Sequence, residues 1–386
     1  MYSGTDETVA LCALNKSFGS RPKTAVALIE AFGNANSLYS LGRSDLGNLP
    51  RNIAERIQPR DLDGAARELT ALRRLGISFT GYTLDSYPQL LKECPDPPIG
   101  LYVRGETPLE RLFAPRKRIA VVGTRNATAY GTDWCSRLVD ALGRTTERPA
   151  IVSGLALGID ISAHRAALNA GLPTIAVLAT CPTSVYPASH SDFARRMCAT
   201  ENCALISDYP PDTPTMRHNF VRRNRIIAGL CDATVLIESS AKGGGMITAN
   251  LAFSYSRDVY ALPGRIDDIH SAGCNRLIRA KIAEPVIDTD SFIEALRLDS
   301  GQQVSKAASP DEIAARYSDS LPQEKTALMA GILTLIISSH GISTEDIATR
   351  LDIQYNAAAE IVFLLEADSI IRTDLFQRCF FIAKNP

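Results

Sequence analysis

The sequence lacks the features that would point to a membrane, an oxidising compartment or a structural metal site. Its longest apolar stretch, around Ala330 to Ile337, is far shorter than the roughly 20 residues that a membrane-spanning helix needs. The N-terminus has no basic region followed by an apolar core, so no signal peptide is expected. The 9 cysteines include no C-x-x-C pair, which fits neither a disulfide framework nor a zinc site. We therefore expect reduced thiols, a cytoplasmic location, and no metal, cofactor or membrane partner.

The sequence also lacks an excess of positive charge. Its net charge is −1, so any attraction to nucleic acid must come from a local patch. One such patch is evident, because no Asp or Glu occurs from Thr213 to Cys231, where Arg222, Arg223 and Arg225 surround Asn224. Arginine is preferred for planar, bidentate contacts to phosphate, and guanidiniums this close repel each other unless an anion lies among them. The stretch predicts a phosphate-binding pocket whose partner is a nucleic acid backbone.

Residues 81–298 show the pattern of an α/β domain. Short apolar runs that end in Gly, Ser or Asp alternate with helical segments. Strands that are apolar throughout are typical of a parallel sheet between two helix layers, and right-handed crossovers then give a Rossmann-like doubly wound fold. The predicted strands are 119–122, 150–153, 174–178, 204–206, 234–237 and 259–262. The predicted helices are 128–143, 160–170, 192–198, 222–230 and 247–255.

Two smaller modules flank this region. Residues 1–80 predict short helices, as in a module of the SAM or helix-hairpin-helix kind, or alternatively a purely structural or dimerising helical cap. The polar residues 299–320 predict a linker. Residues 321–386 follow the order of a winged helix-turn-helix, three helices and then two strands. Its candidate recognition helix has no Lys or Arg, which favours contact with a protein over contact with DNA.

The first predicted strand runs into Gly123, Thr124 and Arg125. Glycine allows a tight turn at the strand end, and the following helix offers free amide groups to an anion. A purely structural glycine turn remains the alternative, because the motif is short.

The second predicted strand ends at Ser153 and Gly154, and opens a loop that resembles a nucleotide-binding turn. The Ser153 hydroxyl is expected to be available as a donor, and both residues are predicted to contact single-stranded DNA. The loop lacks the full G-x-G-x-x-G, and no acidic residue stands where a ribose would bind, so an NAD site is disfavoured. We expect Asp160 to cap the next helix. We expect His164 to be a core or dimer-surface residue.

Later strand ends add Lys242, which precedes Gly243 and Gly244, and then Asn275. Glycines after a lysine allow close approach of the backbone to phosphate, although the order is not that of a Walker A loop. The alternative is a flexible loop with a solvated lysine. Asn275 is expected either to bond a base or sugar, or to cap the following helix.

The predicted strand ends thus bring Arg125, Arg222, Arg225 and Lys242 to one edge of the sheet. No Ser-His-Asp triad, metal-ligand cluster or isolated carboxylate pair accompanies them in the sequence. A phosphate pocket without an evident nucleophile favours binding over turnover, so we expect no catalytic residues.

Several long motifs in this order resemble the DNA-processing protein A (DprA/Smf) family of bacterial natural transformation. They are VVGTR, SGLALGID, VYP, FVRRNRIIAGL, the K-G-G-G loop with ITA, LPG and G-x-N-x-L-I. The resemblance implies a homodimer that binds single-stranded DNA, protects incoming strands during competence and loads the RecA recombinase. It implicates these residues, with Phe220 stacking on a base: Arg125, Phe220, Arg222, Asn224, Arg225, Lys242 and Asn275.

The chain departs from the family pattern at three places. The lysine loop is K-G-G-G where K-S-G-S is frequent. Cys181 stands where a Gly usually precedes VYP, and Lys281 stands where a Gly is usual after the L-I of the last motif. These departures affect detail in the pocket but leave the charged anchors in place.

Two other functions are alternatives to DNA binding by the central domain. A nucleotide-acting phosphoribohydrolase of the lysine-decarboxylase-like fold would share the core, but its P-G-G-x-G-T-x-x-E pattern is absent. A regulator that grips DNA through the winged helix is disfavoured by the acidic balance of 321–386.

Overall fold

The computed structural model describes residues 6–42, 45, 48–58, 60–298, 310–318, 321–339, 342–368, 370–373 and 378–381. Two compact units are present, residues 1–300 and residues 301–386.

A nine-stranded sheet in the described residues organises the first unit, in the order β1-β2-β6-β5-β4-β3-β7-β8-β9. The seven strands β6-β5-β4-β3-β7-β8-β9 run parallel to one another. Strand β2 is antiparallel to both of its neighbours, β1 and β6. The predicted strands of the parallel sheet are confirmed, and the antiparallel pair β1–β2 was not anticipated. The strands are β1 Ile77–Gly81, β2 Gly100–Arg104, β3 Arg118–Val122, β4 Ala150–Ser153, β5 Thr174–Val177, β6 Ala204–Ser207, β7 Ala233–Leu236, β8 Asp258–Ala261 and β9 Glu284–Pro285.

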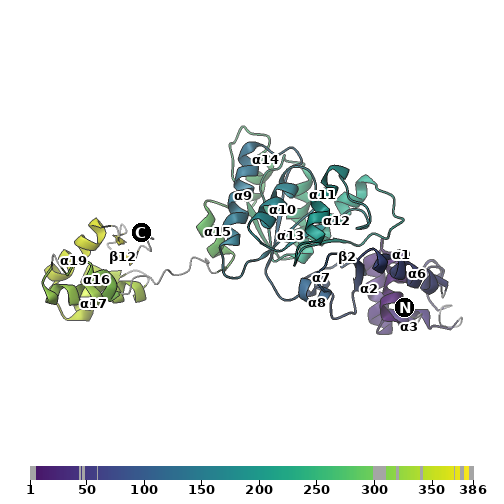
Figure 1. Ribbon diagram of the computed structural model, residues 1–386, viewed down its shortest axis with the longest axis horizontal. Coiled ribbons are helices and arrows are strands. Elements are labelled where there is room, and N and C mark those ends of the chain that lie inside the picture. The colour runs from purple at the N-terminus through teal and green to yellow at the C-terminus, as the bar shows by residue number, and fades with distance from the viewer. Residues whose placement is uncertain are drawn as a thin grey trace. The chain divides into compact units, whose positions relative to one another are not determined.

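Helices cover both faces of this sheet (Figure 1). Alternate residues along each strand join different cores: Ala120 and Val122 pack with α12 and α13, while Ile119 and Val121 pack with α9, α10 and α15. Burial on both faces explains why these strands are apolar throughout. The helices are α7 Gln89–Lys92, α8 Leu109–Leu112, α9 Ala129–Gly143, α10 Ile159–Asn169, η1 Ala188–His190, α11 Ser191–Cys198, α12 Arg217–Leu230, α13 Gly244–Ser254, α14 Ala272–Arg279 and α15 Thr289–Ala295.

Two helices begin earlier than the sequence predicted. Helix α12 starts at Arg217 rather than 222, and α13 starts at Gly244 rather than 247. Of the glycines after Lys242, Gly243 precedes the helix and Gly244 and Gly245 are its first residues, as expected of glycines that open a helix.

The N-terminal residues form short helices that pack on the antiparallel end of the sheet. Their core joins Phe18 and Leu38 to Phe79 of β1 and Tyr102 of β2. The predicted boundary at residue 80 therefore falls inside β1. The helices are α1 Glu7–Phe18, α2 Pro22–Phe32, α3 Ala35–Tyr39, α5 Arg51–Ala54 and α6 Arg60–Arg74.

The second unit combines helices with a three-stranded sheet in the order β10-β12-β11. Part of the predicted linker is helical, since Pro310–Ala315 form α16 and Ile313 packs in the core of this unit. Residues 299–309, the part of the predicted linker that precedes α16, lie outside the described residues. The remaining elements are α17 Gln323–Ser339, β10 Ile342–Ser343, α18 Thr344–Leu351, α19 Tyr355–Ala367, β11 Ile371–Thr373 and β12 Arg378–Phe381.

None of the nine cysteines, all of which lie in the described ranges, is joined to another by a disulfide, and eight of them are buried. Burial raises the pKa of the Cys135 thiol to about 12 and that of Cys94 to about 11. Such thiols are poor nucleophiles, because the thiolate is the reactive form. Among the described residues, no helix combines the length and the apolar character needed to cross a membrane.

Candidate nucleic-acid interface

The strand order reverses between β3 and β7, and three predicted motifs meet at their carboxyl ends. The Thr124 amide donates a hydrogen bond to the Glu238 carbonyl at 2.8 Å, and the Thr124 carbonyl accepts one from the Ile159 amide at 3.1 Å. In open α/β sheets such a reversal point is where ligands bind. The geometry therefore joins the chain after β3, the loop after β4 and the chain after β7 in one place.

Two glycines allow this close approach of loops. Gly158 has φ +75°, and a Cβ atom there would lie 2.2 Å from the Thr124 carbonyl oxygen. A Cβ atom on Gly123 would lie 2.6 Å from Cγ1 of Ile159. Any other residue would force the G-T-R turn and the start of α10 apart.

An exposed cation and two aromatic rings lie beside this junction. The Arg125 guanidinium carbon is 5.4 Å from the centre of the Phe220 ring, and the Phe220 ring meets Tyr186 edge-to-face at 5.2 Å. Tyr186 is 50% exposed and Arg125 is exposed. No ion pair to Arg125 occurs within the described part of the chain. A free guanidinium next to accessible rings is the combination that single-stranded nucleic acid recognises, because phosphate meets the charge and bases stack on the rings.

The arginine cluster does not surround a common pocket, which corrects the prediction. Arg223 is buried, and its Nη1 donates to the carbonyl of Gly154 at 2.7 Å and to the carbonyl of Val177. Burial lowers the pKa of Arg223 to about 10, while the charge of Asp160 opposes this shift. Arg223 thus holds the ends of β4 and β5 together through Nη1, and its buried side chain is not exposed to a ligand.

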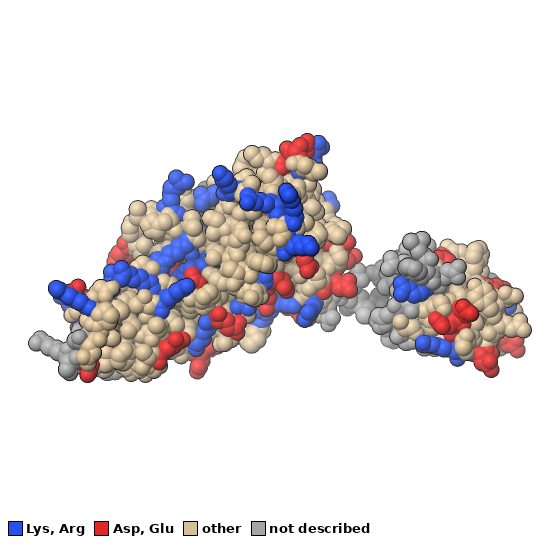
Figure 2. All heavy atoms as spheres, turned by 180° about the vertical axis from the view of Figure 1, so that it is seen from behind, with Lys and Arg blue, Asp and Glu red and all other residues tan. Residues whose placement is uncertain are grey.

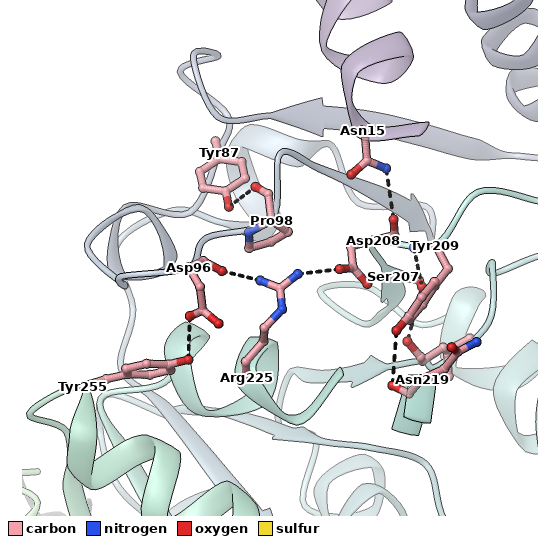
Figure 3. A network of polar contacts seen from close by, with 11 residues as sticks. Asn15, Tyr87, Asp96, Pro98, Ser207, Asp208, Tyr209, Asn219, Arg225 and Tyr255 are labelled. Atoms are coloured by element: carbon pink, nitrogen blue, oxygen red, sulfur yellow. Dashed lines mark hydrogen bonds and ion pairs between the residues drawn. The ribbon is translucent and has the colours of Figure 1, made fainter. Parts of the chain in front are cut away.

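Arg225 is also internal, so its predicted role as a strand contact is wrong. Its Nη2 donates to Oδ2 of Asp208 at 2.6 Å, with the two side chains only 6% and 4% exposed. Its Nη1 donates to the Asp96 carbonyl, and the Asp96 carboxylate accepts from the Tyr255 hydroxyl at 2.7 Å (Figure 3). The prediction failed because Asp208 lies outside the acid-free stretch in sequence but beside it in space.

Arg222 and Asn224 stay at the half-buried surface of α12. The Nη2 atom of Arg222 is buried without a hydrogen-bond partner among the described residues. Asn224 follows Phe220 by four residues, so the two side chains share a helix face. Of the predicted cluster, these residues remain candidates to contact a ligand.

The loop after β4 is built from internal contacts. Ser153 is fully buried and its hydroxyl donates to the Val121 carbonyl at 2.6 Å, so it is not available to a strand as predicted. The Asp160 carboxylate accepts from the amides of Gly154 at 3.1 Å and Ala156 at 3.4 Å. Because Gly158 precedes the first residue of α10, Asp160 is not the helix cap but the residue that shapes the loop.

His164 is a core residue, one of the two alternatives that the sequence left open. Its Nδ1 lies 2.7 Å from the Thr174 hydroxyl, and the side chain is fully buried. Burial lowers the pKa of His164 to about 3, and the neighbouring Arg223 adds to the shift. The ring is therefore neutral at physiological pH.

Lys242 is exposed and lies two residues before the first residue of α13, which begins with Gly244 and Gly245. With Gly243, Met246 and Asn250 it borders a shallow hollow of about 400 Å³ on that helix. The described residues provide no carboxylate partner for Lys242. It remains a free cation on the chain that follows β7.

Asn275 is committed to the loop after β8. Its Oδ1 accepts from the Gly264 amide at 3.2 Å, and its Nδ2 donates to the Gly264 carbonyl at 3.0 Å. Neither predicted alternative, base contact or helix cap, describes this role. The side chain instead fixes the L-P-G turn at the sheet edge.

Sequence reasoning missed three residues that shape the site. Glu238 is buried and accepts from the Thr128 amide at 2.9 Å and from its hydroxyl at 2.5 Å, which ties the G-T-R segment to β7. Tyr186 adds an exposed ring, and the V-Y-P motif was the available signal for it. Asp208 neutralises Arg225, and nothing in its sequence neighbourhood indicates that partner.

Basic side chains are distributed over a broad face of the 1–300 unit (Figure 2). Figure 2 shows Lys and Arg side chains spread over the upper part of one face of the 1–300 unit, with Asp and Glu mostly toward its lower edge. Within the described ranges, no group of three His, Cys, Asp or Glu residues could hold a metal ion.

Comparisons with known proteins agree on one family. The model of the DNA recombination-mediator protein A family matches residues 78–297. The putative DNA processing protein DprA of Mycobacterium tuberculosis is 36% identical over 280 residues, which cover 69% of each chain. The DNA processing protein DprA of Bacillus subtilis is 36% identical over 213 residues, 55% of this chain and 69% of that protein.

Two solved structures share the architecture. DNA processing protein A from Streptococcus pneumoniae superposes with a TM-score of 0.62 at 29% identity, covering 73% of this chain and 95% of that one. DNA processing protein A from Helicobacter pylori, described for its single-stranded DNA binding mode, gives a TM-score of 0.50 at 28% identity, covering 57% and 95%.

Proposed function

The chain belongs to the DNA recombination-mediator protein A family, and from this premise we propose that it binds single-stranded DNA at the carboxyl edge of its sheet. The observation that carries the proposal is the exposed Arg125 guanidinium over Phe220, with Tyr186 edge-on to the same ring. Arg125, Arg222 and Lys242 neutralise phosphates, and the two rings stack on bases. The function is binding, with no chemical turnover.

Geometry narrows the set of residues that contact the strand. Thr124, Asn224, Gly243 and Gly244 remain contact candidates at or near the surface. By contrast, Gly123, Gly154 and Asn275 position neighbouring loops. Ser153 and Arg225 belong to the interior.

We further propose that the protein protects incoming DNA during natural transformation and loads a RecA-type recombinase onto it, as a homodimer in the cytoplasm. Supporting this is the family membership together with the exposed Arg125, Phe220 and Tyr186 surface. A nuclease-protection assay, followed by strand exchange with the recombinase, tests both steps. Unprotected strands, or exchange no faster than without the protein, would contradict this part of the proposal.

We propose that residues 1–80 are a helical module of the SAM or helix-hairpin-helix kind and that residues 321–386 are a winged helix. The order α17, β10, α18, α19, β11, β12 supports the second assignment. Helix α19 carries no Lys or Arg and exposes Tyr355 and Phe363 to 52% and 70%, which supports contact with a protein and not with DNA.

The decisive experiment is a salt titration of binding to a labelled single-stranded oligonucleotide beside its duplex. We expect tight, salt-sensitive binding to the single strand, with Arg125→Ala lowering the salt slope by about 0.7 for one lost phosphate contact. Arg125→Lys is the matched control, because it keeps the charge. Equal binding of strand and duplex, or an unchanged slope in Arg125→Ala, would reject this site and direct attention to nucleotide ligands.

A further inference from the structure

A groove between α10 and α11 lies outside the site described above. It has a volume of about 440 Å³, and its lining includes Arg165 and Asn169 of α10, and Phe193 and Arg196 of α11. Both helices follow parallel strands and run back from the carboxyl edge of the sheet. The groove therefore begins near that edge and descends along the outer face of the helix layer.

The groove has the charge and the ring that a nucleic acid strand needs. Arg165 and Arg196 are exposed, and neither has a carboxylate partner in the portion of the chain that the structure describes. The Arg165 guanidinium lies 6.0 Å from the centre of the half-buried Phe193 ring. Asp192, the carboxylate of the lining, pairs with Arg195 at 3.1 Å, which leaves the two groove arginines uncompensated.

The groove is continuous with the Arg125 site along the chain. Ser189 lines the groove and is three residues after Tyr186, whose ring contacts Phe220. Consecutive Cα atoms are 3.8 Å apart, so Tyr186 and Ser189 are separated by at most about 11 Å. That separation is about three nucleotide steps at the 3.4 Å spacing of a duplex strand.

We infer that a single strand held at Arg125, Phe220 and Tyr186 crosses the sheet edge at Ser189 and continues into the α10–α11 groove. There Arg165 and Arg196 bind consecutive or nearby phosphates, and the Phe193–Arg165 pair supports a base. This inference rests on the proposed function, and it adds a second set of contacts that only a strand longer than the first site can reach.

The test compares two labelled oligothymidylates, of about 6 and about 20 nucleotides, on wild-type full-length protein and on Arg165→Ala/Arg196→Ala. For the longer strand we expect affinity to fall on the order of tenfold and the salt slope to decrease by about 1.4, the value for two lost contacts on a single strand. For the shorter strand we expect wild-type affinity. Arg165→Lys/Arg196→Lys should restore long-strand binding.

The matched control is Arg73→Ala/Arg74→Ala, which removes two exposed arginines of α6 that form no ion pair with any carboxylate of the described residues. Wild-type long-strand affinity in the groove variant would overturn the inference, and so would an equal loss for both lengths at an unchanged melting temperature. Arg125→Ala separates the two proposals, since loss of short-strand binding there with an unaffected groove variant rejects the groove alone. Failure of the wild type to bind either strand rejects both.

Discussion

Helix α12 carries two contrasting regions, an exposed face at its first turn and a buried ion-paired network less than two turns later. Phe220 stands under the free guanidinium of Arg125, whereas Arg225 is enclosed by Asp208 and the Asp96 carbonyl. Both regions come from one short motif rich in arginine. What separates them is whether the fold supplies a carboxylate, and this decides which charges remain available to a ligand.

The largest effect that would sharpen this comparison is expected from Arg225→Ala. It leaves the buried Asp208 carboxylate unpaired, so we expect the free energy of unfolding to drop by about 3–5 kcal/mol, measured by chemical denaturation. Arg225→Met combined with Asp208→Leu removes both charges and should recover most of that loss. A stable Arg225→Ala protein with weakened DNA binding would restore Arg225 to the interface and break the distinction.

Burial of His164 should also make the stability of the protein depend on pH. No such dependence is expected from the exposed pair Arg125 and Phe220. The folded pKa of His164 is about 3, below its ordinary 6.5, because of burial and then of Arg223. The unfolded chain therefore takes up a proton as pH falls below 6.5 and the folded one does not. We expect this residue to remove about 2 kcal/mol of stability between pH 7 and pH 5.

His164→Asn provides the control for this pH effect. Subtracting the pH dependence of the variant from that of the wild type removes other groups, above all Asp160, whose pKa burial raises. A difference that stays constant between pH 7 and pH 5 would show that the histidine is not held neutral by the fold.

On the exposed side, Phe220→Ala should weaken single-strand binding by about tenfold, because stacking of a base on an aromatic ring contributes roughly 1–3 kcal/mol. Fluorescence anisotropy with an oligothymidylate measures this, and Phe220→Tyr serves as the variant that keeps a ring. Stability should change little, since Phe220 is only half-buried. Unchanged affinity would mean that the ring supports Arg125 without meeting a base.

The smallest effect is expected from Lys242→Ala. One exposed point charge contributes one phosphate contact, so the salt slope should decrease by about 0.7 with a loss of only a few-fold in affinity. Lys242→Arg keeps the charge and should match the wild type. A slope identical to that of the wild type would favour the solvated-lysine alternative that the sequence left open.

Much of the fold was predictable from sequence because its strands are buried on both faces and read as apolar runs. Strands β1 and β2 escaped prediction, since they pair antiparallel at the end of the sheet and depend on contacts with the N-terminal helices. The edge of the sheet where ligands bind was also predictable, from Gly123 and the glycines around 154–158. These residues mark strand ends directly.

The sequence did not predict which individual side chains face outward and which are bonded inside the protein. Arg222, Arg223 and Arg225 look alike in sequence, and their separation depends on the true start of α12 and on partners that are distant along the chain. Asn275 likewise looked free for a ligand but bonds a turn 11 residues earlier. A motif can identify the edge of a site, whereas hydrogen-bond partners decide which members face outward.

The contacts that join the N-terminal helices to the sheet, including the strand pair β1–β2, limit how this part of the gene can recombine. Asn15 of α1 donates to the Asp208 carbonyl at 2.9 Å, next to the ion pair of Arg225 (Figure 3). A recombination event that exchanged the first 80 codons would cut β1 and remove a donor from the rim of β6. The N-terminal helices and the sheet must therefore diverge together, whereas residues 301–386 form a compact unit of their own.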